Sequence, residues 1–583
     1  MTGLRIDLIR RYLRPHKKTL LFGAISLIIV NLLSVVIPME VRSIIDDLQS
    51  QFSVNYFLSK AGWIVLLATA MGLIRLISRQ LVFGVGRQIE VDLRQKLFDH
   101  MLTQEPGWVQ EVGSGEVISR ATSDIENIRR LLGFTVLSLT NTSLAYIFTL
   151  PAMFTIDPWL SLAAIALYPL MLGIVGIFGA RMVGQRKRQQ EALSSLSELI
   201  QEDLSGISAI KIYGQEAAEL KAFMDRNNIY RDSAINLAKT ASTLFPLLQG
   251  ISSISLLLLL GLGSIQLQRE LISVGGLVAL ILYVERLVFP TALLGFTLNT
   301  FQIGQVSLER IEELLTKQPK IKNVAKPIRL TQEIKGKIEA RNLTIKYELS
   351  DINVLDNISF VIEPGELVAI VGPVGCGKTT LARALGRMIE IDNNQLFIDD
   401  YDVVNLSLKD IRKNIAFVPQ EGYLFTATLN ENLKYGDPKA SAKKVKEAAK
   451  EAMLYSDIKG FPKGFETLVG ERGITLSGGQ RQRTALGRAM LVESPIIVLD
   501  DALASVDNKT ASAILNKIRS KSNRTVVMIS HQLSAAAAAE RILVIDEGKV
   551  VQQGNHINLI KIEGTYKRLW DREKAVQSIK EEN

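Results

Sequence analysis

Six apolar segments in the first half of this 583-residue chain constrain its fold more than any other feature. Each holds roughly 20 residues, the length that an α-helix needs to cross a bilayer. Because lipid offers no hydrogen-bond partners, a segment of this kind must satisfy its backbone as a helix, and a soluble protein is excluded. The expected spans are Thr19–Pro38, Ala61–Phe83, Leu131–Pro151, Trp159–Ala180, Leu244–Ile265 and Ile272–Leu294.

Lysine and arginine are unevenly distributed among the segments that connect these spans. They concentrate before the first span, between the second and third, and between the fourth and fifth, whereas the alternate loops hold only exceptions such as Lys60 and Arg269. The positive-inside rule therefore predicts that both termini and the two long loops are cytoplasmic. Residues Leu4–Arg14 resemble a surface helix, and connectors near Gly113–Asp124 and Tyr213–Glu219 are expected to dock on a cytosolic domain.

The net charge of +9 does not indicate nucleic acid as a partner, because the basic residues are not interleaved with aromatic ones. Cytoplasmic loops of a protein embedded in a lipid bilayer explain the same charge. The single cysteine, Cys376, excludes a disulfide framework and a cysteine-based metal site.

A glycine-rich loop in the second half has the spacing Gly-x-x-x-x-Gly-Lys-Thr. An apolar run, Glu366–Val371, precedes it and a helix-forming stretch, Leu381–Met388, follows, which is the context of a phosphate-binding loop. Backbone N–H groups at such glycines curl around an anion, and the helix N-terminus adds partial positive charge. The nucleotide-binding candidates are Gly372, Pro373, Val374, Gly375, Cys376, Gly377, Lys378, Thr379 and Thr380.

Two further segments complete the expected site. Lys378 is expected to reach the β- and γ-phosphates, and the Thr379 hydroxyl to hold Mg²⁺ together with Asp500, at the end of the aliphatic run Ile496–Asp501. A Ser-Gly-Gly turn within Leu476–Gln480 predicts a second helix N-terminus that binds anions. The expected domains are a membrane domain at residues 1–316, a linker at 317–334 and an ATP-binding domain at 335–583.

These motifs, in this order, resemble the ATPase domain of ABC transporters. The six spans, the leading surface helix and the Gly115–Asp124 and Tyr213–Glu216 regions are similar to the membrane half of the same family. The resemblance covers essentially the whole chain. It implies an all-α six-helix transmembrane domain followed by an α/β P-loop nucleotide-binding domain of ABC type, in a half-size exporter that uses ATP and Mg²⁺.

The resemblance also assigns roles to single residues. Tyr347 is expected to stack on adenine, Gln420 to be the catalytic and Mg²⁺-binding residue of the Q-loop, and His531 to sense the γ-phosphate, while Ala504–Asp507 matches the D-loop. Two ATPase domains are expected to close head to tail, so a second half-transporter is required. Each ATP then lies between the phosphate loop of one chain and the partner's equivalents of Ser477, Gly478, Gly479 and Gln480.

One residue departs from the family pattern. Asp501 stands where the family usually has the glutamate that polarises the attacking water, and its carboxylate reaches about 1.5 Å less far. A general base must lie within about 3.2 Å of its proton, so the sequence predicts a weakly hydrolysing site, as in one subunit of bacterial heterodimeric exporters. The alternatives are a relayed water or a small backbone shift that leaves Asp501 catalytically adequate, as in a homodimeric lipid or drug flippase.

The cargo is only broadly indicated. Charged residues in or near the second and sixth spans, Arg75, Arg79, Glu285 and Arg286, are candidates for substrate contact, although the last two are also placed to pair with each other. The remaining span residues are consistent with an amphiphilic or lipid-like substrate. A nucleotide-gated channel or regulatory subunit is the alternative from another class.

Overall fold

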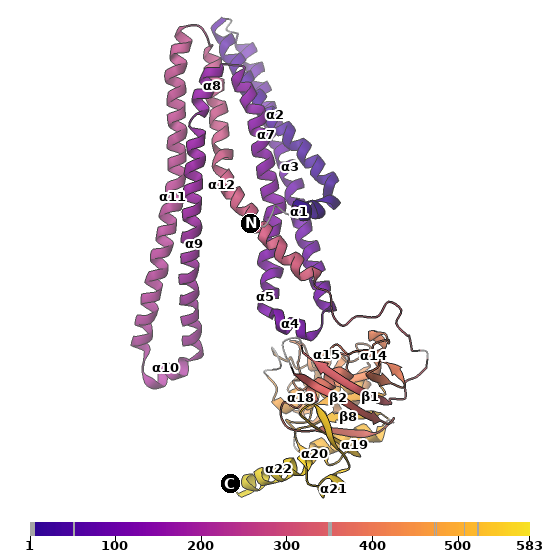
Figure 1. The fold of residues 1–583 in the computed structure, drawn as a ribbon. Coiled ribbons are helices and arrows are strands. Elements are labelled where there is room, and N and C mark those ends of the chain that lie inside the picture. The colour runs from indigo at the N-terminus through magenta and orange to yellow at the C-terminus, as the bar shows by residue number, and fades with distance from the viewer. Residues whose placement is uncertain are drawn as a thin grey trace. The chain divides into compact units, whose positions relative to one another are not determined.

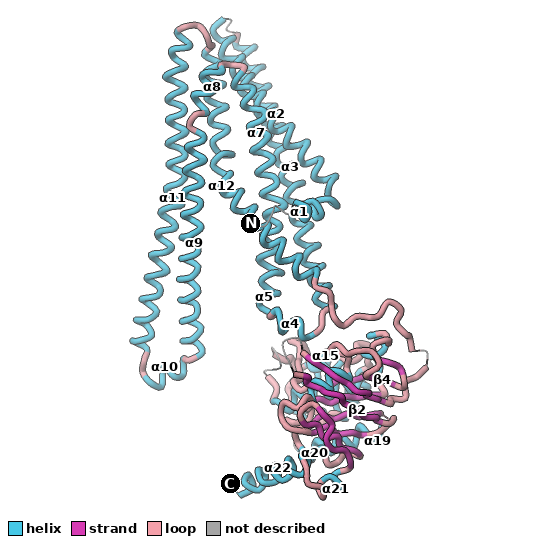
Figure 2. The backbone as a smooth tube through the Cα atoms, viewed as in Figure 1, coloured by secondary structure: helices cyan, strands magenta, loops and turns pink. Residues whose placement is uncertain are grey.

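The computed structural model describes residues 6–50, 53–330, 332–347, 352–470, 473, 475–506, 508–521 and 524–582. The chain divides into two compact units. The first comprises Met1–Leu102 and Gly113–Lys317, and the second comprises Thr103–Val112 and Gln318–Asn583. Within the described residues, every strand lies in the second unit, as the colouring of Figure 2 makes plain.

The first unit is built from helices (Figure 1). Six helical stretches are long and apolar enough to cross a membrane, and each overlaps one predicted span, which confirms the six-span prediction. The helices of this unit are α1 (Ile6–Leu13), α2 (Lys17–Ser50), α3 (Val54–Thr103), α5 (Ser114–Ser119), α6 (Ile125–Arg130), α7 (Val136–Phe154), α8 (Pro158–Ile165), α9 (Tyr168–Ser205), α10 (Ile207–Tyr213), α11 (Glu216–Gln268) and α12 (Val274–Thr316).

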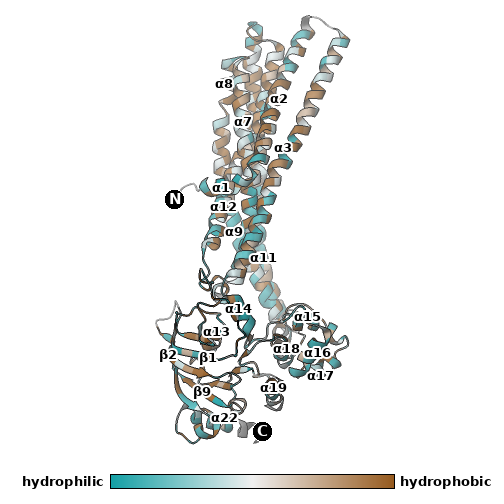
Figure 3. Ribbon diagram, turned by 90° about the vertical axis from the view of Figure 1, so that its right-hand side faces the viewer, coloured by the Kyte–Doolittle hydropathy of each residue, from teal (hydrophilic) through white to brown (hydrophobic). Residues whose placement is uncertain are grey.

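Several of these helices are far longer than a bilayer is thick. The 53 residues of α11 span about 80 Å at 1.5 Å per residue, against a hydrocarbon core of about 30 Å. Figure 3 shows the corresponding change from apolar to polar residues along the helices. The predicted continuation of the spans as polar rods is therefore present, and α9 and α11 pack against each other as a hairpin closed by α10.

The fourth span is interrupted where the sequence suggested an unbroken helix. A turn at Ala166 and Leu167 separates α8 from α9. Pro169 explains the interruption, because it has no N–H to donate to the carbonyl of Ile165 and restricts the residue before it. Tyr168, at the start of α9, uses its hydroxyl to donate to the Val284 carbonyl oxygen of α12 at 2.8 Å.

Helix α12 holds the membrane helices together. Tyr283 donates to the Val35 carbonyl oxygen of α2 at 2.6 Å, and Thr297 shares a 2.9 Å hydrogen bond with Ser138 of α7. Gly275 allows α2 to approach closely, because a Cβ there would lie 2.3 Å from the Arg42 carbonyl oxygen. Small residues and interhelical hydrogen bonds replace the hydrophobic effect, which does not drive association in lipid.

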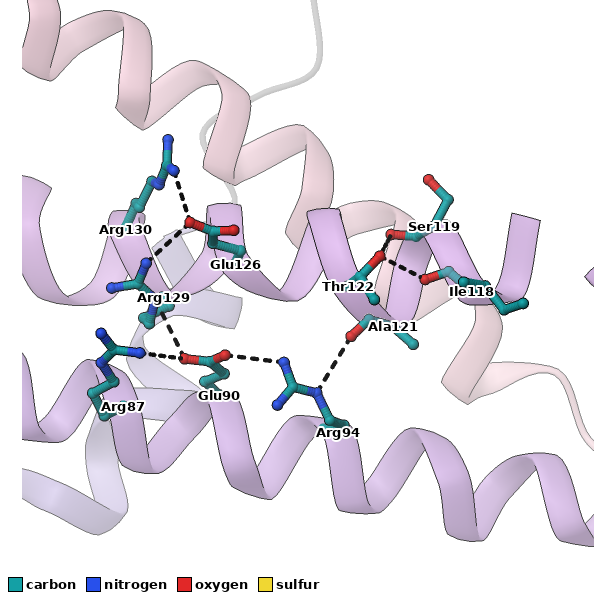
Figure 4. A network of polar contacts seen from close by, with 10 residues as sticks. All are labelled: Arg87, Glu90, Arg94, Ile118, Ser119, Ala121, Thr122, Glu126, Arg129 and Arg130. Carbon is teal, nitrogen blue, oxygen red and sulfur yellow. Dashed lines mark hydrogen bonds and ion pairs between the residues drawn. The ribbon is translucent and has the colours of Figure 1, made fainter. Parts of the chain in front are cut away.

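A charged network joins α3 to α6 beyond the apolar segments (Figure 4). Glu90, whose side chain is only 14% exposed, pairs with Arg94 at 3.0 Å and with Arg129 at 3.3 Å. Glu126 accepts from Arg129 at 3.1 Å and from Arg130 at 2.7 Å. A partly buried carboxylate surrounded by several arginines is a multidentate link, so it holds the polar extensions of the two helices in register.

The second unit contains two sheets. The six-stranded sheet has the order β10-β9-β3-β8-β7-β6, in which all neighbours are parallel except β10 and β9, and the four-stranded antiparallel sheet has the order β2-β1-β4-β5. The strands are β1 (Ile338–Lys346), β2 (Asn353–Ile362), β3 (Leu367–Val371), β4 (Leu396–Ile398), β5 (Tyr401–Asp402), β6 (Ile415–Val418), β7 (Ile496–Asp500), β8 (Thr525–Ile529), β9 (Arg541–Asp546) and β10 (Lys549–Gly554).

The sheet's central strands β3, β7 and β8 are buried at every residue, as expected for parallel strands covered on both faces. This confirms the α/β prediction. The helices of this unit are α4 (Pro106–Val112), α13 (Lys378–Leu385), α14 (Leu408–Asn414), α15 (Leu429–Lys434), α16 (Ala442–Glu451), α17 (Tyr455–Gly460), α18 (Gly478–Leu491), α19 (Asn508–Lys521), α20 (Leu533–Ala536), α21 (His556–Leu559) and α22 (Thr565–Glu582).

A segment just upstream of the first expected docking connector belongs to the second unit. The sequence suggested Gly113–Asp124, but Thr103–Val112 is the segment that belongs to the second unit. Its helix α4 buries Trp108 to 1% exposure, and Glu105 accepts from the Lys320 backbone N–H at 3.3 Å. Residues 113–124 belong instead to the first unit, where Ser307 of α12 donates to Asp124 at 2.6 Å. A buried tryptophan on a seven-residue helix is too short a pattern to be recognised by periodicity.

Candidate nucleotide-binding site

The glycine-rich loop joins β3 to α13 at the carboxyl end of the central strand. Lys378, the first residue of α13, is 4% exposed, and its ammonium group donates to the carbonyl oxygens of Gly372 at 2.9 Å and Pro373 at 2.7 Å. A lysine ammonium enclosed by a loop of its own backbone is a buried positive charge, and the two carbonyl oxygens that accept from it are neutral. This charge at a helix N-terminus fits a phosphate group.

Two glycines in the loop are required by their backbone geometry. Gly377 has a φ of +102°, and a Cβ there would lie 2.7 Å from the Val354 carbonyl oxygen. A Cβ on Gly372 would lie 2.0 Å from the Ile545 carbonyl oxygen. Cys376 lies inside the loop with 6% exposure, and burial raises the pKa of its thiol. The thiol is therefore protonated at neutral pH and acts as a small packing group.

The two residues expected to hold Mg²⁺ lie next to each other. The Thr379 hydroxyl donates to Asp500 Oδ1 at 3.4 Å, across from α13 to the end of β7. Asp500 is 3% exposed, and burial raises its pKa although the Thr379 hydrogen bond opposes the shift. Hydroxyl and carboxylate oxygens are hard ligands of the kind that Mg²⁺ prefers, so these side chains fit the ion.

Asp501 and His531 come together because β7 and β8 are adjacent parallel strands. Asp501 has a left-handed φ of +49°, and its Oδ1 accepts from the His531 backbone N–H at 3.3 Å. Its own N–H donates to the Ile529 carbonyl oxygen at 3.0 Å. The Asp501 carboxylate is therefore tied to its own sheet, while the His531 residue is exposed.

The Ser-Gly-Gly turn opens α18 as a capping box. Ser477 accepts from the Gln480 N–H at 3.3 Å, and Gln480 Oε1 accepts from the Ser477 N–H at 3.0 Å. Gln480 also donates to Asp457 at 3.1 Å. Within the part of the chain that the structure describes, no hydrogen bond joins Ser477, Gly478, Gly479 or Gln480 to the phosphate loop, so the two anion-binding elements are separate in one chain.

The remaining predicted site residues differ in their exposure and in their contact with the phosphate loop. The Tyr347 hydroxyl shares a 3.2 Å hydrogen bond with Thr380, which places the ring beside the phosphate loop, and its residue is 39% exposed. Gln420 follows β6 and is exposed. In the predicted D-loop, Ala504 and the residues up to Val506 are described, whereas Asp507 lies outside the described residues.

Comparison with known proteins agrees with this arrangement. Residues 20–291 match the ABC transporter transmembrane region, and residues 355–504 match the family described as ABC transporter. The chain is 30% identical to a multidrug resistance-like ATP-binding protein MdlA of Buchnera aphidicola, over 94% of this chain and 95% of that protein. The chain belongs to the ABC transporter family.

Two further similarities extend over most of this ABC transporter. It is 33% identical to an ATP-dependent lipid A-core flippase of Aromatoleum aromaticum, over 87% of this chain and 84% of the flippase. It also shares the fold of a bacterial Atm1-family ABC exporter solved with ATP bound, with a TM-score of 0.76, 24% identity, and coverage of 97% and 98% of the two chains.

The family defines the transporter's general activity and assembly. It is a multi-pass membrane protein whose ATPase domain couples ATP hydrolysis to transport. One membrane region and one ATPase domain in a single chain make a half-transporter, which functions as a dimer.

The structure also reveals a residue that the sequence reasoning did not select. Gln482 of α18 is 9% exposed, its Nε2 donates to the Gln420 carbonyl oxygen at 3.3 Å, and its Oε1 accepts from the Ser505 N–H at 3.0 Å. It therefore joins the Q-loop to the D-loop. A glutamine on a polar helical stretch gives no sequence signal for such a role, because its two partners are 62 and 23 residues away.

Proposed function

We propose that this transporter is one half of an ATP-driven exporter for an amphiphilic or lipid-like substrate. The similarity to multidrug resistance-like and lipid A-core flippase proteins supports export of such a substrate. The lysine and arginine distribution supports a cytoplasmic location for both termini and the ATPase domain. We place the membrane domain at residues 1–316, the linker at 317–334 and the ATP-binding domain at 335–583.

The geometry supports a defined role for each site residue. The loop Gly372–Thr380 and the Lys378 ammonium would hold the phosphates, Thr379, Asp500 and Gln420 would hold Mg²⁺, and Tyr347 would stack on adenine. Bound Mg-ATP supplies a phosphoanhydride whose charge the ion neutralises. His531 would contact the γ-phosphate. The Ser477–Gln480 turn would face the ATP of the partner half-transporter, since among the described residues no hydrogen bond joins it to the phosphate loop of its own chain.

We further propose, on the basis of Asp501, that this site hydrolyses ATP weakly. Its carboxylate is one methylene shorter than that of glutamate, and the hydrogen bond from the His531 N–H holds one oxygen against the sheet. Both effects would keep the carboxylate too far from the attacking water, beyond the ends of the strands, to accept its proton. A partner that supplies a glutamate would then carry most of the turnover in a heterodimer.

The Mg-ATPase rate of this chain purified alone in lipid tests the proposal, with Lys378→Ala as the blank. We expect folded protein that binds ATP and hydrolyses it no faster than the blank. A rate clearly above the blank would establish a self-sufficient homodimer and refute the weak-site proposal.

A homodimeric lipid or drug flippase is the second candidate function. The presence of His531 favours it, because this residue would contact the γ-phosphate in an active site. Accumulation of a lipid-like probe against a gradient in inverted vesicles supports either pump. Passive equilibration would instead indicate a nucleotide-gated channel.

A further inference from the structure

Helix α12 carries an arginine in the middle of the membrane-spanning part of the first unit. Arg286 lies about 18 Å along α12 from its first residue, which is roughly half the thickness of a bilayer core. Its Nη1 donates to Thr149 Oγ1 at 3.1 Å, and its Nη2 donates to Asn31 Oδ1 at 2.9 Å. Asn31 and Thr149 are buried, so the guanidinium is held between α2, α7 and α12.

The charge of Arg286 has no counter-ion among the described residues. Its hydrogen-bond acceptors are the side chains above and the Asn31 carbonyl oxygen, and all of them are neutral. Glu285 is exposed and makes no ion pair with Arg286, so the pairing considered from the sequence does not occur within one chain.

Cations near the end of α2 and the start of α3 have acidic partners. Arg42 pairs with Asp46 at 3.7 Å, and Lys60 pairs with Glu40 at 3.6 Å. Cations there are neutralised within the chain, whereas Arg286, among the described residues, is not. An uncompensated charge at this depth costs several kcal/mol, and a neutral residue would join the three helices without that cost.

The donors that remain on Arg286 match an acidic group. A guanidinium carries five N–H donors, and the hydrogen bonds above involve only Nη1 and Nη2. The residue is partly exposed at the surface of the single chain. The N–H groups that remain, on Nε and Nη1, can each donate to an oxygen of a carboxylate or phosphate, and such charge-assisted hydrogen bonds are stronger where water is scarce.

We propose that Arg286 is a binding residue for the anionic headgroup, phosphate or carboxylate, of the transported amphiphile. This inference rests on the proposed export function and narrows its substrate class to acidic amphiphiles. The same chemistry is offered by a membrane lipid and by a free amphiphile, so the experiment includes both sources.

Binding of matched probes to the full chain in neutral phosphatidylcholine nanodiscs tests the inference. Dodecyl phosphate and dodecyltrimethylammonium have the same tail and opposite charge, and empty nanodiscs correct for partitioning. We expect dodecyl phosphate to bind at least tenfold more tightly to the unmodified chain, and Arg286→Gln to remove that preference. Arg269→Gln, at an exposed position after α11, makes the same change in net charge and is expected to keep it.

Equal affinity of the two probes for the unmodified chain would overturn the inference, as would a preference that survives in Arg286→Gln. If that variant does not fold, Arg286→Lys is the second variant. It keeps the charge but removes the Nε donor, so unchanged anion affinity would overturn the argument from the remaining guanidinium donors. If phosphatidic acid competes with dodecyl phosphate, the site binds the headgroup of a membrane lipid. If it does not compete, the site binds the acidic group of a free amphiphile. No nucleotide is added, so the result does not depend on ATPase activity. Failure of the headgroup-binding proposal can therefore be distinguished from failure of the proposed export function.

Discussion

Replacing Asp501 with glutamate tests how the catalytic carboxylate is positioned. The substitution adds one methylene and extends the carboxylate by about 1.5 Å. In the structure, the shorter side chain accepts a hydrogen bond from the His531 backbone N–H at 3.3 Å. Glutamate would reach past this contact toward the attacking water.

The expected change in ATPase rate follows from the added length of the side chain. A misplacement of about 1 Å costs roughly 100-fold in rate, so Asp501→Glu should raise the ATPase rate by about 10- to 100-fold. The substitution also has a structural cost, because the φ of Asp501 is +49° and a left-handed conformation suits aspartate better than glutamate. Stability should fall by up to about 1 kcal/mol, which thermal unfolding measures.

The assay is Mg-ATP hydrolysis by the reconstituted chain, corrected with Lys378→Ala. Asp501→Asn is the matched control, because it keeps the acceptor for the His531 N–H and removes the carboxylate. It should bind nucleotide and hydrolyse none. If Asp501→Glu binds nucleotide normally and its rate does not rise, carboxylate reach does not limit turnover and the geometric reasoning is refuted.

Three further predictions concern the same unit. Gln482→Met removes both loop contacts and should raise the Mg²⁺ concentration needed for half-maximal ATP binding, with a stability loss of about 1–3 kcal/mol. Thr484→Val, which loses only a hydrogen bond within α18, should leave the Mg²⁺ dependence of binding unchanged, and equal Mg²⁺ curves for both variants would show that Gln482 is merely structural. Cys376 should react slowly with thiol reagents at neutral pH, because burial raises its pKa, and faster as rising pH forms the thiolate; rapid labelling at pH 7 would contradict its burial. Gly377→Ala should abolish nucleotide binding, because its φ of +102° and the 2.7 Å approach to the Val354 oxygen leave no room for a Cβ; retained binding of a fluorescent ATP analogue would contradict this.

Much of the fold could be predicted because its signals are local. A span is a predominantly apolar run of consecutive residues, and all six were identified by length and composition. The phosphate loop is a contiguous motif between a strand and a helix, and β3 and α13 flank it as expected. The proximity of Thr379 and Asp500 followed from the motif order, although 121 residues separate them.

Other features depend on which elements become neighbours. The turn within the fourth span follows from Pro169, but its sequence signal is the same as that of Pro246 or Pro290, which lie inside continuous helices. A proline breaks or merely bends a helix according to whether neighbouring helices satisfy the freed carbonyl. The place of Thr103–Val112 in the second unit could not be predicted for a related reason, since the burial of Trp108 depends on the unit to which α4 belongs.

Sequence by itself determined that this chain has six membrane spans, one phosphate loop and an aspartate at the position of the usual glutamate, because each is written in consecutive residues. Only the tertiary structure decided that Gln482 joins two loops, that Asp501 is tied to the next strand, and that Arg286 meets neutral partners instead of Glu285. These are contacts between distant segments, and their chemistry depends on distances of a few ångströms that no local pattern encodes.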